Sequence, residues 1–121
     1  MCTPSTVAKD YIALWNEPDE SRRLMMLADT WTKDATYVDP IMCGKGHGEI
    51  SALVGAVHAK FPGFVFSLIG SADGYGDYLR FSWSFGPVGS NAVIKGTDYV
   101  RVSGDQIATV TGFLDLVPAG A

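Results

Sequence analysis

A change in the hydrophobic period near residue 63 constrains this chain more than any other feature. Before Pro62-Gly63, apolar residues recur at the three- and four-residue spacing of amphipathic helices, and after it they alternate with polar residues as in β-strands. The strand-like segments are residues 64–72, 77–86, 91–103 and 106–117. Short turns rich in Gly, Asp and Ser separate them, which favours antiparallel neighbours. The sequence therefore predicts one α+β domain over residues 1–121, with helices followed by a long meander.

The N-terminal half carries three helix patterns and one short strand. Ser5 or Thr6 is expected to cap the first helix, which ends near Asn16 because Pro18 disfavours helical geometry before it. Asp19 or Ser21 is expected to start the second helix. A strand over residues 35–39 and a third helix that ends before residue 62 complete this half. The residues predicted to face the core are Val7, Tyr11, Leu14 and Trp15 on the first helix, and Leu24, Met25, Leu27 and Ala28 on the second.

Composition and charge remove several classes of function. Apolar residues make up 47% of the chain and charged residues 18%, as in ordinary globular proteins. The net charge is −4 and no basic run occurs, so neither nucleic acid nor an anionic membrane is an expected partner. No apolar run approaches the roughly 18 residues of a membrane helix. Since the N-terminus lacks the pattern of a secretory signal, a cytoplasmic location is expected.

No metal site or cofactor is expected from the cysteines and histidines. Cys2 and Cys43 form no metal or redox spacing, and His47 and His58 do not make a metal motif. The glycine run after Asp39, in TYVDPIMCGKGHGEI, lacks the Ser or Thr of a phosphate-binding P-loop. A flexible turn that precedes the third helix is the alternative interpretation of this run.

The strand at residues 92–102 carries the most informative polar residue. Because strand side chains alternate between two faces, Asp98 shares a face with Ile94, Gly96, Val100 and Val102. That face is otherwise apolar, which predicts that Asp98 points into the protein interior. The expected neighbours from the adjacent strands are Phe81, Trp83, Val110 and Leu114.

A buried carboxyl group at position 98 has two possible roles. Burial disfavours the charged form and raises the pKa, so that Asp98 could donate a proton or a hydrogen bond near neutral pH. Alternatively, Asp98 only ties down a backbone or tryptophan N–H group. Asp39 and Tyr11 also have a purely structural interpretation beside a functional one. Asp39-Pro40 is a common way to end a strand, and Tyr11 fits a position in the core.

Four stretches together resemble the NTF2-like superfamily, and within it the SnoaL-like proteins and the ketosteroid isomerases. They are YIALWN (11–16), DATYVDP (34–40), the meander, and GTDYVRVSGDQIATVTGFLD (96–115). The resemblance covers nearly the whole chain and implies a cone-shaped fold, in which a curved antiparallel sheet wraps around N-terminal helices and leaves an internal pocket. The fold hosts many activities, so it does not by itself determine function.

The resemblance assigns roles to three residues. Asp39 matches the proton-shuttling base of ketosteroid isomerases, while Asp98 and Tyr11 match their oxyanion-stabilising donors. A cofactor-free isomerase or cyclase that acts on a small apolar carbonyl compound is implied. Gly96 stands where limonene epoxide hydrolases need an arginine, which argues against that activity. The expected pocket residues are Trp15, Trp31, Val54, His58, Phe81, Trp83, Val110 and Leu114.

A module without catalytic activity is the alternative. It would bind an apolar ligand or serve dimerisation, and the opposite face of the meander supports it. Large side chains are expected to point outward there and could form a sheet-to-sheet homodimer contact. They are Tyr78, Val93, Tyr99 and Phe113.

Overall fold

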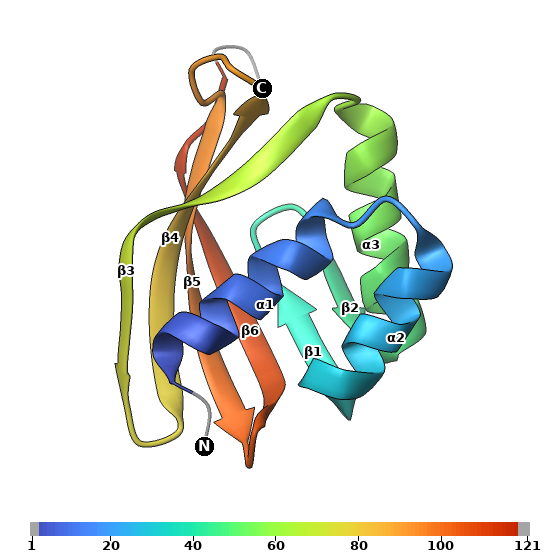
Figure 1. Cartoon of the computed structure of the whole chain (residues 1–121), viewed down its shortest axis with the longest axis vertical. Coiled ribbons are helices and arrows are strands. Elements are labelled where there is room, and N and C mark those ends of the chain that lie inside the picture. Colours follow the sequence, from blue (N-terminus) through green and yellow to red (C-terminus); the bar gives the residue numbers. More distant parts are fainter. Residues whose placement is uncertain (1–2, 119–121) are drawn as a thin grey trace.

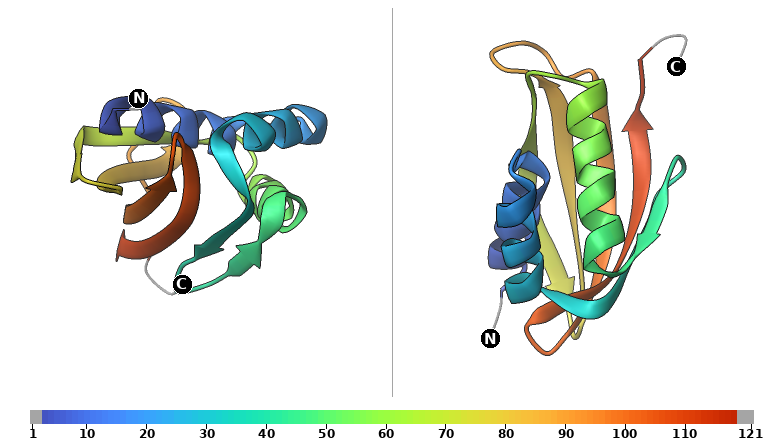
Figure 2. Two further views of the ribbon diagram at one scale, coloured as in Figure 1. Left: turned by 90° about the horizontal axis from the view of Figure 1, so that it is seen from below. Right: turned by 90° about the vertical axis from the view of Figure 1, so that its right-hand side faces the viewer.

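The structure is a computed structural model that describes residues 3–118. Over these residues it contains the helices α1 (Pro4–Asn16), α2 (Glu20–Thr30) and α3 (Gly46–Lys60), and the strands β1 (Trp31–Val38), β2 (Cys43–Lys45), β3 (Phe64–Tyr75), β4 (Tyr78–Pro87), β5 (Ile94–Ser103) and β6 (Gln106–Leu116). The strands form one sheet in the order β2-β1-β6-β5-β4-β3. The sheet is strongly curved and the helices lie on its concave side (Figures 1 and 2). This arrangement confirms the predicted cone-shaped α+β fold.

The helix ends follow local capping rules, with one correction. Thr3, rather than Ser5 or Thr6, caps α1, and its hydroxyl oxygen accepts a hydrogen bond from the Thr6 N–H at 3.2 Å. Pro4 explains the difference, because proline fits the first helical position, where its missing N–H is not needed. The helix ends at Asn16 as predicted. Asp19 caps α2 by accepting from the Arg22 N–H at 2.9 Å.

The sheet begins earlier in the chain than the sequence predicts and is not wholly antiparallel. β1 starts at Trp31 rather than Ala35, and it pairs with β6 in parallel. The three-residue strand β2, absent from the prediction, pairs with β1 through a hairpin that begins after Asp39. So short an edge strand depends on its partner for its hydrogen bonds, which no local pattern reveals.

The predicted faces of the long strands are confirmed, whereas one helix face is wrong. Leu79, Phe81, Trp83 and Phe85 of β4 are all buried, as are Gly96, Asp98 and Val100 of β5. On α2, however, Met25 is 68% exposed and Arg23 is buried instead. Arg23 donates hydrogen bonds to the Ser51 hydroxyl and to the carbonyl oxygens of the loop between α1 and α2. The loop carbonyl oxygens need hydrogen-bond donors, and the buried guanidinium of Arg23 supplies them.

The core places one carboxyl group among aromatic rings. The buried cluster joins the inner faces of α1, β4, β5 and β6, and Asp98 is the only carboxylate among its buried neighbours within residues 3–118. None of the helices in this part of the chain is long and apolar enough to cross a membrane.

Candidate active site

Two strands that flank β6 place a carboxyl group on each side of Gly112. In the sheet register, Asp98 of β5 lies opposite Gly112, and Val38, which precedes Asp39, lies opposite Thr111. A Cβ atom at position 112 would lie 2.8 Å from Asp98 Oδ1 and 3.2 Å from Asp39 Cβ. The absence of a side chain at Gly112 therefore gives both aspartates room in the same small volume.

Asp98 is a buried carboxyl group with one strong hydrogen bond. It is 1% exposed, and Oδ2 accepts a hydrogen bond from the Tyr11 hydroxyl at 2.5 Å. Oδ1 has no hydrogen-bond partner among the described residues. Desolvation raises the pKa of Asp98 to about 6, and the charge of Asp39 adds to this rise, although the hydrogen bond from Tyr11 opposes it. The Trp83 indole N–H also opposes the rise without reaching hydrogen-bond geometry. The predicted direction of the pKa is confirmed.

Tyr11 is held on the inward face of α1 by aromatic packing. Its ring centroid lies 4.9 Å from that of Phe81 in an edge-to-face contact, and 5.9 Å from that of Trp31. Burial, followed by the nearby charge of Asp98, raises the pKa of the Tyr11 hydroxyl well above its usual value. The group therefore stays protonated and can act as a hydrogen-bond donor over the physiological pH range.

Asp39 directly follows the last residue of β1, Val38, and it also lines the cavity. The strand-end role and the site role that the sequence left open are therefore both compatible with its position. Its Oδ1 accepts hydrogen bonds from the backbone N–H groups of Ile41 and Met42 at 2.8 and 2.9 Å. Its Oδ2 accepts from the Tyr37 hydroxyl at 2.6 Å. A carboxylate has about four acceptor positions, so one position on Oδ2 is left for a further proton. The turn fixes the orientation of the carboxylate, and the remaining acceptor position allows it to act as a base.

Tyr37 belongs to the site although the sequence analysis did not select it. It is buried, and burial, followed by the charge of Asp98, raises the pKa of its hydroxyl. The signal was present in the sequence, because Tyr37 lies two residues before Asp39 on one strand and so shares its face. Tyr11 donates to Asp98 and Tyr37 donates to Asp39, so each of the two aspartates has a tyrosine hydroxyl beside it.

These four polar residues line a cavity of about 470 Å³ that is open to solvent. The size is within the range of small-molecule sites. Most of its wall is apolar and comes from α1, α3, the hairpin after Asp39, the strands β3 to β6 and the segment after β6. The lining residues are Tyr11, Trp15, Tyr37, Asp39, Ile41, Met42, Ala56, Val57, Lys60, Phe61, Phe66, Trp83, Phe85, Ile94, Asp98, Leu114, Val117 and Pro118.

The expected pocket residues divide into two groups. Trp15, Trp83 and Leu114 line the cavity. The others lie behind its wall: Trp31, Val54, Phe81 and Val110 are packed in the core, and His58 Nε2 contacts the Trp15 carbonyl oxygen at 2.7 Å. Side-chain alternation correctly separates inside from outside, but it does not distinguish a cavity wall from the solid core beneath it.

The glycine run has a structural role. Gly44 lies in β2, and the Glu49 carboxylate of α3 accepts a hydrogen bond from the Lys45 N–H at 2.9 Å. His47 Nε2 contacts the carbonyl oxygens of Trp31 and Thr32 at 3.2 and 2.9 Å, which ties α3 to the start of β1. Within residues 3–118 no group of three or more potential metal ligands occurs.

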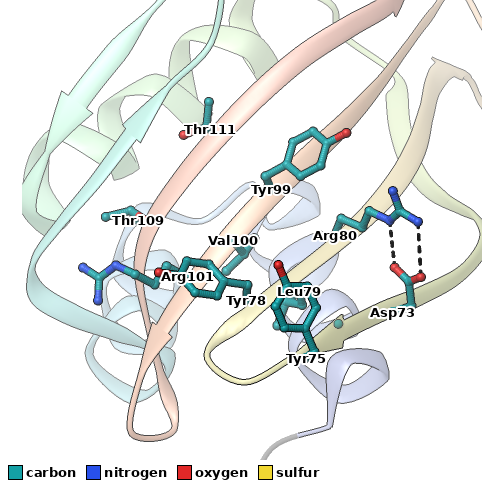
Figure 3. A pocket seen from close by; sticks show the side chains of 11 residues that line it. Asp73, Tyr75, Tyr78, Leu79, Arg80, Tyr99, Val100, Arg101, Thr109 and Thr111 are labelled. Carbon is teal, nitrogen blue, oxygen red and sulfur yellow. Dashed lines mark hydrogen bonds and ion pairs between the residues drawn. The ribbon is translucent and has the colours of Figure 1, made fainter.

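A second hollow, of about 630 Å³, lies on the outer face of the sheet (Figure 3). Tyr75, Tyr78, Tyr99 and Arg101 contribute to its wall, and Arg80 and Asp73 form an ion pair there at 2.9 Å. Both members of that pair are well exposed, with side-chain accessibilities of 60% and 65%. The ion pair lowers the pKa of Asp73 and raises that of Arg80, so both groups stay charged, and among the described residues no buried carboxyl group lines this hollow as Asp98 lines the inner cavity.

The fold and the inner cavity define a class: a cone-shaped α+β protein that holds two carboxyl groups in an apolar chamber. The chain belongs to the SnoaL-like domain family, which matches residues 8–110. A crystal structure of a SnoaL-like family protein from Agrobacterium tumefaciens str. C58, provisionally called an isomerase, is similar at 40% identity. It has a TM-score of 0.90, with 95% of this chain and 99% of that chain covered.

More distant solved structures share the fold alone. A protein from Kribbella flavida DSM 17836, provisionally called a ketosteroid isomerase, is 16% identical with a TM-score of 0.70, over 98% of this chain and 82% of that chain. A protein from Jannaschia sp. CCS1, provisionally called a SnoaL-like polyketide cyclase, is 12% identical with a TM-score of 0.68, over 95% and 90% of the two chains. No curated protein matches the chain significantly.

Proposed function

We propose that this protein is an acid–base enzyme that moves a carbon-bound proton within a small, largely apolar carbonyl compound, as an isomerase or cyclase of the SnoaL-like and ketosteroid isomerase-like type. The observation that carries the proposal is the meeting of Asp39, Tyr11 and Asp98 at one apolar cavity. The chemistry uses only these side chains. An apolar wall suits an apolar substrate, and a substrate that fills the open cavity excludes water from the reacting groups.

Asp39 acts as the base in this proposal. Its Oδ2 takes a proton from the carbon beside the carbonyl group, and the electron pair of the broken C–H bond forms the enolate. The same oxygen then returns the proton to another carbon atom, or to the new bond partner in a cyclisation. The hydrogen bonds from Ile41, Met42 and Tyr37 keep this carboxylate in one orientation while it shuttles the proton.

Tyr11 donates to the enolate oxygen, and Asp98 supports it. When Asp98 is protonated, the contact of 2.5 Å can reverse, so that Asp98 donates to the Tyr11 oxygen. The Tyr11 O–H group is then free to point at the substrate. A preset donor at the position of developing charge is worth about 3–4 kcal/mol in well-studied enzymes. A direct contact between Asp98 and the substrate would require movement, since Oδ1 is buried.

Exchange of α-protons tests the base. The bicyclic ketone 2-decalone is incubated with the protein in D₂O, and deuterium incorporation is followed by mass spectrometry. Asp39→Asn keeps an oxygen for the turn but cannot take a proton, so exchange should fall at least about 100-fold. The matched control is Asp34→Asn, an exposed aspartate of β1, the strand that leads to Asp39, and it should leave exchange unchanged. Exchange that survives Asp39→Asn would remove Asp39 from the mechanism.

We also propose that the outer sheet face pairs two copies of the chain. Tyr78, Tyr99 and Phe113 are 56%, 45% and 53% exposed, and Tyr99 and Phe113 pack edge to face at 5.7 Å. A patch of this kind on three adjacent strands is typical of an interface. Arg101 lies at one end of the patch and Asp115 at the other, so a twofold axis between them would bring opposite charges together.

Analytical ultracentrifugation tests this pairing. Tyr99→Glu should shift a dimer to monomers, whereas Met25→Glu, an exposed apolar position on α2, should not. A wild-type chain that sediments as a monomer would refute it. A dimer that binds apolar ketones but exchanges no α-proton would instead favour the alternative of a binding module without catalytic activity.

A further inference from the structure

Lys60 is the one cation on the wall of the inner cavity within the described part of the chain. It is the last residue of α3, and it shares a stripe of that helix with Ala56, Val57 and Phe61, which also line the cavity. Residues four apart on a helix lie on the same face, so Lys60 follows Ala56 along the wall. Both residues are exposed, so Lys60 lies at the edge where the cavity wall meets solvent.

The ammonium group is held at the rim and has no anionic partner. Lys60 Nζ lies 5.6 Å from the centroid of the Phe61 ring, a cation–π contact. Across residues 3–118 the single ion pair joins Arg80 and Asp73 on the outer face. The stem of Lys60 can cover apolar surface while its charge remains available at the opening.

The carboxyl groups of the cavity and the Lys60 ammonium differ in how deeply they are buried. Asp98 is almost completely buried and Asp39 is half-buried, whereas Lys60 is exposed. The wall of the same cavity also carries aromatic side chains such as Trp83 and Phe66. An anionic group on a ligand would be repelled by the carboxylates of the cavity wall and attracted by the exposed ammonium of Lys60.

From this arrangement we propose that Lys60 selects apolar ligands that carry a negatively charged group at one end, such as a carboxylate or sulfonate. The proposal rests on the proposed function in one respect, namely that the inner cavity is the binding site. The charged end stays at the rim beside Lys60, and the apolar body fills the aromatic middle of the cavity. This orientation sends the carbonyl end of a substrate towards Tyr11 and Asp39.

A matched pair of fluorescent dyes tests the selectivity. 8-Anilinonaphthalene-1-sulfonate and N-phenyl-1-naphthylamine share an apolar skeleton, and only the first carries an anion. Lys60→Met removes the charge but keeps an unbranched apolar side chain. It should weaken binding of the sulfonate dye about three- to fivefold, the range of a partly exposed ion pair, and leave the neutral dye unchanged. Lys60→Arg should retain the sulfonate affinity, and 2-decalone should displace both dyes if they occupy the cavity.

Lys95→Met is the control, because Lys95 is an exposed lysine on β5 whose neighbours Ile94 and Gly96 point to the inner face. It should change neither affinity. An equal loss for both dyes in Lys60→Met, an unchanged sulfonate affinity, or an equal effect of Lys95→Met would overturn the proposal. So would a wild-type chain that binds neither dye. Absence of ketone exchange in a protein that shows the predicted dye selectivity would count only against the proposed catalysis.

Discussion

Replacing Asp98 by Asn should make the protein more stable at alkaline pH and leave it nearly unchanged at acid pH. The ionised carboxylate of Asp98 is disfavoured in the core, where desolvation is the largest cause of its raised pKa. Asparagine is neutral at every pH and has nearly the same shape. Its side-chain oxygen can accept the hydrogen bond that Tyr11 donates to Asp98.

The magnitude follows from the pKa of Asp98. It rises from 3.8 in an unfolded chain to about 6 in the fold, and each pKa unit corresponds to about 1.4 kcal/mol. The folded state therefore binds this proton more tightly than the unfolded state does. The resulting stability is present below about pH 4 and is lost as the pH rises to about 6. Above that pH the wild type carries a cost of about 3 kcal/mol that Asp98→Asn avoids.

Urea unfolding of the wild type and the variant at about pH 4 and about pH 8 measures this difference. The other carboxylates contribute the same pH dependence to the free energy of unfolding of both proteins, so their contribution cancels. The free energy of unfolding of Asp98→Asn, relative to the wild type, should rise by about 2.5 kcal/mol between the two conditions. Asp34→Asn, at an exposed position, should show a change within about 0.5 kcal/mol. An equal difference at both pH values would refute the reasoning that burial raises the pKa of Asp98.

Three further predictions follow from the site geometry. The kcat/KM for ketone exchange should fall as the pH rises through about 6, because the protonated form of Asp98 is lost there; a profile that rises instead would assign Asp98 the role of a base. Gly112→Ala should abolish most exchange and lower the free energy of unfolding by about 1–3 kcal/mol, since its Cβ would press on both aspartates. Gly48→Ala, where nothing lies within 4 Å, is its control and should be nearly neutral. Tyr37→Phe should cost about 1.5–3 kcal/mol of stability by removing a buried hydrogen bond to a charged group, as urea unfolding would measure; a loss below 0.5 kcal/mol would show that this bond is weak.

Much of the sheet could be predicted because its determinants are local. The alternation in β4 and β5 predicts that Phe81, Trp83 and Asp98 point inward, and the structure buries all three. The direction of the Asp98 pKa followed from that placement alone, since burial penalises a charge whatever surrounds it.

The cavity wall could not be predicted to the same extent, because it depends on how separate elements approach one another. Trp31 and Trp15 both have the character of pocket residues, yet Trp31 lies in the core and Trp15 lines the cavity. The parallel pairing of β1 with β6 joins segments distant in sequence, and this pairing brings Asp39 level with Gly112. Because β1 and β6 are far apart in the sequence, no short stretch of it specifies how the two strands pair.

The sequence by itself determined the α+β class, the inward direction of Asp98 and the end of a strand at Asp39, because hydrophobic period and turn chemistry act over a few residues. Only the tertiary structure decided that Asp39 and Asp98 share a cavity and that Lys60 lies at its opening. Those relations depend on long-range register and on the curvature of the sheet, which arise only when all the strands pack together.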